Sequence, residues 1–195
     1  MDLDGKRIGF AITGSFCTFT LVMPVIEELV KLGADVTPIL SYNAANNDTR
    51  FFKVKDFKQF LIETTGHDII DDIVKAEPIG PKKLLDLVII APCTGNSLAK
   101  LALGITDTPV LLAAKSHLRN SRPVLVAVST NDALAANAKN MGLLLNTRNI
   151  FLVPYRQDDS VKKRASVVAD MGGIVSAAKL ALDGRQAEPL MLEPR

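Results

Sequence analysis

Residues 85–100 read LDLVIIAPCTGNSLAK, and this stretch decides the fold class. Its apolar run over 85–91 is typical of a strand that is buried on both faces. A turn of small polar residues follows, and the spacing beyond it predicts a short helix over 96–103. Strand, turn and helix in this order form the repeating unit of a parallel α/β sheet.

The same unit occurs at the start of the chain. The run RIGFAIT over 7–13 predicts a buried strand, and apolar residues at steps of three and four from Phe19 to Val30 predict a helix. Gly33 suits a helix C-terminal cap, and DVTPILS over 35–41 predicts the next strand. Pro24 lies inside the helical pattern, so the helix either begins near it or bends there.

Further along, a polar, Asn-rich segment over 42–50 predicts a loop. Helices are expected over 54–65, over 109–118 and from Asp132, and strands over 123–128 and 149–153, the latter as the last clear strand. The longest helix is expected over 160–183. We therefore predict one α/β domain over 1–185, with a doubly wound, Rossmann-like (flavodoxin-like) parallel sheet and helices on both faces, followed by a C-terminal tail over 186–195.

Composition excludes several classes of function. Lys and Arg total 23 against 21 Asp and Glu, and the basic residues are scattered, so no nucleic-acid footprint is present. No apolar run approaches the ~20 residues that span a bilayer. Two cysteines without metal-ligand spacing indicate neither a disulfide framework nor a metal site, and they suit a reducing cytoplasm. We expect His117 at the surface near a helix end and Cys17 in the core or a loop.

Four predicted strands end in turns rich in hydroxyls and carboxamides, at 13–18, 41–46, 91–97 and 129–132. Carboxyl ends of parallel strands meet at one edge of a sheet, where ligands bind. Such turns suit a phosphate and the edge of a heteroaromatic ring, although the same residues are also ordinary helix caps. GxGxxG and GxxxxGK[ST] motifs are absent from the sequence, so a mononucleotide bound by uncharged groups is favoured over a dinucleotide or a hydrolysed triphosphate.

The turn after the central strand carries the motif of a known family. The pattern Pro-x-x-x-Asn-Thr/Ser-x-Ala-Lys is matched by Pro92, Asn96, Ser97, Ala99 and Lys100. With TGS after the first strand and STND after a later one, the sequence resembles the flavoprotein family of FMN-binding cysteine decarboxylases. That resemblance implies an FMN site at the turns. The implied contacts to the phosphate end are Gly14, Ser15, Phe16 and Ser41, and those to the ring and ribityl chain are Pro92, Cys93, Thr94, Asn96, Ser97, Ser129, Thr130 and Asn131.

The segments KRIGFAITGSFCT, AEPIGPK and TDTPVLLAAKSHLRN look like the branch of this family that serves in dipicolinate synthesis. This branch implies the oxidation of a dihydrodipicolinate-type ring to dipicolinate during sporulation. It also implies NADP on a dehydrogenase partner and a homo-oligomer of this chain. Arg50, in the loop after the second strand, is the candidate for a substrate carboxylate, with an ordinary salt bridge as the alternative. No catalytic acid or base is identified.

Two other functions remain open. One is an FMN-dependent decarboxylase of a small carboxylated substrate, and the other is a non-catalytic, flavin-carrying partner. Three departures from the decarboxylase pattern count against oxidative decarboxylation of a peptidyl cysteine. No cysteine follows Cys93, the helix after the first strand has no histidine, and residues 128–131 read VSTN where the decarboxylases have Pro-x-Met-Asn.

Overall fold

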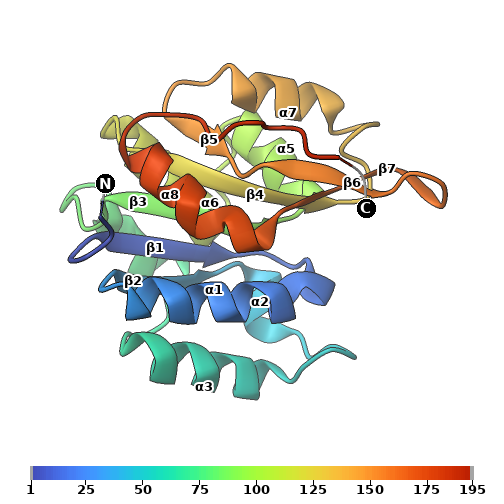
Figure 1. The fold of residues 1–195 in the computed structure, drawn as a ribbon. Helices are drawn as coiled ribbons and strands as arrows, with labels where there is room; N and C mark the ends of the chain where they lie inside the picture. The colour runs from blue at the N-terminus through green and yellow to red at the C-terminus, as the bar shows by residue number, and fades with distance from the viewer. Residues whose placement is uncertain (1, 194–195) are drawn as a thin grey trace.

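The sheet of the computed structural model, which describes residues 2–193, is built around five parallel strands in the order β2-β1-β3-β4-β5 (Figure 1). This is the flavodoxin-like strand order. The parallel strands are β1 (Arg7–Ile12), β2 (Asp35–Leu40), β3 (Leu87–Cys93), β4 (Val124–Thr130) and β5 (Ile150–Leu152). Every residue of β3 is buried, as the uninterrupted apolar run predicts for a central parallel strand.

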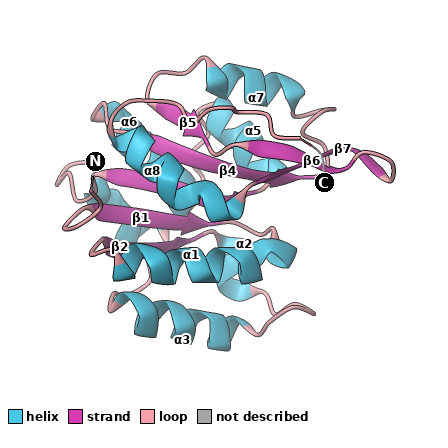
Figure 2. Ribbon diagram, in the orientation of Figure 1, coloured by secondary structure: helices cyan, strands magenta, loops and turns pink. Residues whose placement is uncertain are grey.

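Helices cover both faces of the sheet (Figure 2). On one face α1 (Phe19–Lys31) and α8 (Ile174–Leu182) pack on the strands and on each other. On the other face lie α5 (Gly95–Ala102) and α6 (Pro109–Arg119), with α7 (Ala138–Leu145) against α5. At the β2 edge α3 (Val54–Thr65) packs on β2 and α1. The predicted α/β fold is therefore confirmed.

The helix predicted over 160–183 is wrong for its first half. Residues 155–169 form an antiparallel hairpin of β6 (Tyr155–Asp159) and β7 (Lys163–Ala169), and β7 pairs with the end of β4. The steps of three and four that suggested a helix are coincidental, because Val161 in that series is exposed. Pairing with β4 decides the conformation, and the sheet is consequently parallel only in its larger part.

Smaller corrections concern element boundaries. The loop predicted over 42–50 begins with α2 (Tyr42–Asn46), whose first turn is capped by the Ser41 hydroxyl. The helix expected from Asp132 starts only at Ala138, and β5 is followed by the two strands of the hairpin. Short elements complete the chain: η1 (Phe16–Thr18), α4 (Ile73–Ala76), η2 (Glu77–Ile79) and η3 (Met171–Gly173).

Helix α1 runs through Pro24 rather than starting at it. Proline has no N–H to donate, so the carbonyl of Thr20 loses its helical partner. Both residues are exposed, and water can therefore satisfy that carbonyl.

The segment after α8 returns to the sheet. The Gln186 carboxamide bonds to both backbone groups of Leu152, accepting at 2.9 Å and donating at 2.6 Å. The backbone N–H of Tyr155 donates to the carbonyl of Leu190, and the backbone carbonyl of Tyr155 accepts from the N–H of Leu192. Residues 186–192 therefore lie along β5 and β6. None of the helices within residues 2–193 is long and apolar enough to cross a membrane.

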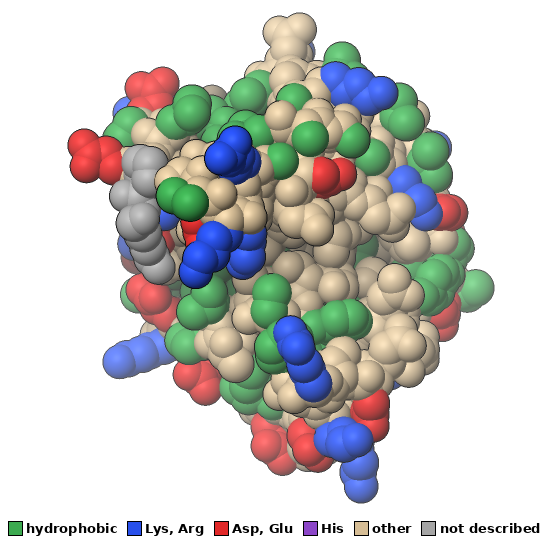
Figure 3. Space-filling model, turned by 90° about the vertical axis from the view of Figure 1, so that its right-hand side faces the viewer, with side chains coloured by type: hydrophobic (Ala, Val, Ile, Leu, Met, Phe, Trp, Pro, Cys, Tyr) green, Lys and Arg blue, Asp and Glu red, His purple; other side chains and the backbone are tan. Residues whose placement is uncertain are grey.

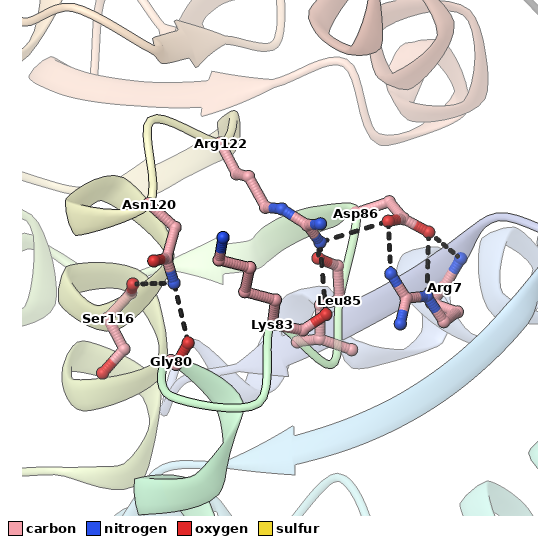
Figure 4. Close-up of polar contacts among 8 residues, drawn as sticks. All are labelled: Arg7, Gly80, Lys83, Leu85, Asp86, Ser116, Asn120 and Arg122. Carbon is pink, nitrogen blue, oxygen red and sulfur yellow. Dashed lines mark hydrogen bonds and ion pairs between the residues drawn. The ribbon is translucent and has the colours of Figure 1, made fainter.

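A charged cluster closes the edge of the sheet where the strands begin (Figure 4). Asp86 accepts from Arg7 at 2.7 Å and from Arg122 at 3.1 Å, and Arg122 also donates to the carbonyl of Leu85. The hydrogen bonds from Arg7 hold the pKa of Asp86 below its usual range. These contacts join β1 to the loops before β3 and β4, so this edge serves stability.

His117 is buried near this cluster, with 2 % of its surface exposed, and the prediction of a surface position is wrong. Its Nε2 has no hydrogen-bond partner among the described residues. Burial, reinforced by the nearby Arg122 charge, lowers the pKa of His117 to about 4. The imidazole is consequently neutral in the folded protein near pH 7.

Candidate functional site

A cavity of about 1260 Å³ opens where the parallel strands end. Figure 3 shows this end of the molecule, with a hollow at its centre and Lys and Arg side chains at its margin. The turns after β1, β3 and β4 line it, together with the hairpin of β6 and β7. It thus lies where β1 and β3 meet, the switch point at which flavodoxin-like folds bind ligands.

Thr13 joins the turns after β1 and β3. Its buried hydroxyl donates to the carbonyl of Pro92 at 2.8 Å and accepts from the N–H of Thr94 at 2.9 Å. The backbone N–H of Thr13 donates to Pro92 as well. One side chain therefore fixes the spacing of two cavity walls, a role that the sequence analysis did not assign.

The turn after β1 offers backbone donors. Gly14, Phe16 and Cys17 each present an N–H that donates to no other described residue, at the start of η1 and α1. The Ser15 hydroxyl lies 2.9 Å from the Ser129 hydroxyl, which joins this turn to the end of β4. Free N–H groups at the start of a helix attract an anion such as a phosphate.

The turn after β3 begins α5. Thr94 caps the helix, since its hydroxyl accepts from the N–H of Ser97 at 3.3 Å. Asn96 lies one residue inside the helix, lines the cavity, and its carboxamide bonds to no other described residue. A free carboxamide can both donate and accept, as the edge of a heteroaromatic ring requires.

The turn after β4 is held by Asp132. This carboxylate accepts from the Thr130 hydroxyl at 2.6 Å and from the buried Asn137 carboxamide at 2.8 Å. The Thr130 bond above all, with Asn137 adding to it, lowers the pKa of Asp132. Gly95 packs directly on this cluster, because a Cβ there would lie 2.5 Å from the Thr130 hydroxyl oxygen. The turns after β3 and β4 are therefore in close contact.

Nine of the predicted site residues line the cavity together: Gly14, Ser15, Phe16, Arg50, Thr94, Asn96, Ser129, Thr130 and Asn131. Four do not line it, namely Ser41, Pro92, Cys93 and Ser97. Ser41 and Ser97 are buried in helix starts, and Pro92 and Cys93 lie within β3. Complete burial raises the pKa of Cys93 to about 12, so its thiol stays protonated.

Sequence reasoning missed the charged wall on the hairpin. Opposite the turns after β1, β3 and β4, where Asp132 is the one charged side chain among the described residues that line the cavity, lie Arg156, Asp158, Lys163 and Asp170. Lys163 and Asp158 pair at 2.7 Å, which raises the pKa of Lys163. The expectation of a neutral cavity is therefore wrong on this side. No alternation of polar and apolar residues marks these strands, because 155–159 read YRQDD and 163–169 read KRASVVA, so the helical spacing over 160–183 was the stronger local signal.

An apolar rim faces the same space. Phe16, Leu21 and Phe51 line the cavity beside the exposed Cys17, and Phe16 packs against Phe52. Backbone donors for a phosphate, free carboxamides for a ring edge and apolar side chains for a ring face thus meet in one cavity. This donor set fits FMN.

Comparison with known proteins agrees with the fold and gives the family. The protein-family model described as Flavoprotein matches residues 1–177. The B subunit of dipicolinate synthase from Bacillus subtilis is 49 % identical over 191 residues, which cover 98 % of this chain and 96 % of that protein. The solved structure of the B subunit of dipicolinate synthase from Bacillus halodurans superposes with a TM-score of 0.92 at 44 % identity, over the whole of both chains.

More distant structures share the fold. DmrB of Burkholderia xenovorans, solved with FMN and described as a cubic protein cage, superposes with a TM-score of 0.68 at 18 % identity, over 94 % of this chain and 98 % of that one. The resemblance inferred from the motifs is confirmed by the family model and by the dipicolinate synthase relatives. With that model matching most of its length and those relatives matching nearly all of it, this chain belongs to the Flavoprotein family.

Proposed function

We propose that this chain is the FMN-binding component of a two-component oxidoreductase that converts a dihydrodipicolinate-type ring to dipicolinate in sporulating cells. The observation that carries the proposal is the cavity at the β1–β3 switch point, with its free N–H groups and carboxamides. The 49 % identity to the B subunit of dipicolinate synthase from Bacillus subtilis supports dipicolinate as the product. In this proposal the partner is an A subunit that brings NADP.

The chain's own residues orient the bound groups. The N–H groups of Gly14, Phe16 and Cys17 hold the phosphate, and Asn96 and Asn131 hydrogen-bond the ring edge. When bound, FMN supplies two-electron redox chemistry. Aromatisation of the dihydro ring removes two electrons and two protons in total, formally one hydride and one proton, and NADP on the partner would be the acceptor of the hydride. In this proposal, four buried residues that do not line the cavity hold the turns that bind FMN in place, namely Ser41, Pro92, Cys93 and Ser97.

The proposal includes a cytoplasmic homo-oligomer. The two free cysteines suit a reducing compartment. The cage formed by DmrB supports self-association in this fold. Closed symmetry is the usual outcome of such association.

Flavin titration followed by turnover tests the function. The purified chain should bind FMN with a change in its visible absorption, and Asn96→Ala should weaken binding about tenfold, the cost of one buried hydrogen bond. Asn146→Ala is the matched control, because Asn146 is exposed at the end of α7, away from the cavity. Unchanged affinity in Asn96→Ala would contradict the site.

Turnover separates the alternatives. The chain with its A-subunit partner and NADP should form dipicolinate, and Asn96→Ala should slow that reaction. Carbon dioxide released from a carboxylated substrate without the partner would show a decarboxylase instead. Full turnover by a variant that no longer binds FMN would show that the flavin is only carried.

A further inference from the structure

Arg156 belongs to a row of directly opposed residues on three neighbouring strands, and this row ends next to the turn after β4. It lies opposite Val168 in the β6–β7 pair, and Val168 lies opposite Ser129 in the β4–β7 pair. Directly opposed residues of antiparallel strands project from the same face of the sheet. Two strand spacings, about 10 Å, therefore separate Arg156 from Ser129 across the cavity that all three residues line.

The guanidinium of Arg156 lacks a close partner. Its side chain is 20 % exposed, and the nearest carboxylate oxygen, Oδ1 of Asp170, is 4.0 Å from Nη2, beyond hydrogen-bond distance. Its side chain donates no hydrogen bond to another described residue. By contrast, the neighbouring Lys163 and Asp158 form an ion pair with an N–O distance of 2.7 Å. A largely buried cation with free donors is costly unless a ligand anion meets it.

Arg50 provides a second free guanidinium in the same cavity. It lies 4.8 Å over the ring of Phe51 and forms no ion pair with any described residue. Arg50 comes from the chain after β2, at one edge of the sheet, and Arg156 from β6 at the other edge. A guanidinium binds a carboxylate through two parallel hydrogen bonds, so each of these two side chains can receive one carboxylate of a ligand in the cavity.

Space for such a ligand exists beside a flavin. A pocket for one small molecule measures roughly 300 to 1000 Å³. This cavity measures about 1260 Å³, and the charged side chains of the hairpin lie on other elements than the turns after β1, β3 and β4. The cavity can therefore hold a second, smaller ring between the cofactor turns and the hairpin.

We propose that Arg156 binds one carboxylate of a small planar dicarboxylate and Arg50 the other, so that the β6–β7 hairpin selects the substrate. The proposal deepens the proposed function and rests on it for the identity of the substrate. The two arginines bind and orient the substrate and take no part in the transfer of electrons.

Calorimetry with dipicolinate, on the full chain with and without FMN, tests the assignment. Arg156→Gln should lower dipicolinate affinity at least tenfold while FMN affinity stays within twofold of the parent. Arg156→Lys should recover part of the loss, since it restores the charge without the bidentate geometry. Arg50→Gln should lower dipicolinate affinity similarly, and picolinate, with one carboxylate, should bind more weakly than dipicolinate.

Arg164→Gln is the control, because Arg164 is an exposed residue of β7 that does not line the cavity. Dipicolinate affinity equal to the parent's in Arg156→Gln, or no dipicolinate binding by the parent, would overturn the assignment. If the parent protein does not bind FMN, the proposed cofactor site is wrong. The titration without FMN then still decides whether Arg156 binds a dicarboxylate. Melting curves of each variant exclude misfolding as the cause.

Discussion

The hydroxyl of Ser15 lies 2.9 Å from the hydroxyl of Ser129, although 114 residues separate them in the chain. The contact joins the turn after β1 to the end of β4, across the carboxyl end of β3. It places two donor–acceptor groups on the wall of the cavity. A pair of hydroxyls that serve each other can also turn toward a ligand at small cost.

Ser129→Ala should weaken FMN binding about fivefold, because it removes a ligand donor and leaves Ser15 without its partner, a loss of about 1 kcal/mol. Flavin absorption titration measures the effect. Ser160→Ala is the control, since Ser160 is exposed, lies outside the cavity and forms no side-chain hydrogen bond with a described residue. Equal affinities in the two variants would argue against a ligand role for Ser129.

Thr13→Val should destabilise the protein by about 2 kcal/mol. The change keeps the shape but leaves the Thr94 N–H without its acceptor and the Pro92 carbonyl with one bond fewer, in a buried site. Urea unfolding measures the loss. Thr147→Val, at an exposed hydroxyl that donates to its own helix, should change stability by less than about 0.5 kcal/mol. A stability loss no larger than that of Thr147→Val would contradict the linking role of Thr13.

Gly95→Ala should disrupt the flavin site. The added Cβ would lie 2.5 Å from the Thr130 hydroxyl and 2.7 Å from both Asp132 and Asn137, so the turns after β3 and β4 must move apart. FMN affinity should fall more than tenfold in titration. Gly142→Ala is the matched change in an open helix position, with nothing within 4 Å of its Cβ, and should stabilise α7 by about 0.5 to 1 kcal/mol. Retained flavin affinity in Gly95→Ala would refute the close packing.

His117 should make the folded protein sensitive to acid. Its pKa of about 4 in the folded protein lies below the ordinary 6.5, so the unfolded chain binds the proton more readily. The stabilisation is complete above about pH 6.5 and is lost as the pH falls toward 4, by at most about 3 kcal/mol. Urea unfolding at pH 7 and pH 4.5 should show a smaller difference for His117→Gln than for the parent. Identical differences would show that another group is responsible.

Much of the fold is readable from the chain because its signals are local. The apolar run before Pro92 makes β3 a buried strand, and the apolar steps from Phe19 to Val30 make α1 a helix. Alternation of such units implies a parallel sheet, and a parallel sheet implies that the strand-end turns share one edge. Nine of the thirteen predicted site residues consequently line one cavity.

The hairpin escaped prediction because its conformation is not local. Residues 160–183 have helical spacing, but β7 is extended as a strand because it pairs with β6 on one side and with Ser129 and Thr130 of β4 on the other. That pairing in turn carries Arg156 to the cavity. The burial of His117 is non-local in the same way. Its position near a helix end suggested exposure, but packing against distant segments buries it.

The sequence by itself determined the alternation of parallel strands and helices as far as β5, the polar turns at the strand ends and the family, since these depend on neighbouring residues. Only the tertiary structure decided that Thr13 links two turns, that Cys93 is fully buried and that a charged hairpin faces the turns after β1, β3 and β4. The physical reason is that hydrogen bonds and burial between distant segments are set by sheet pairing and packing, which no local pattern encodes.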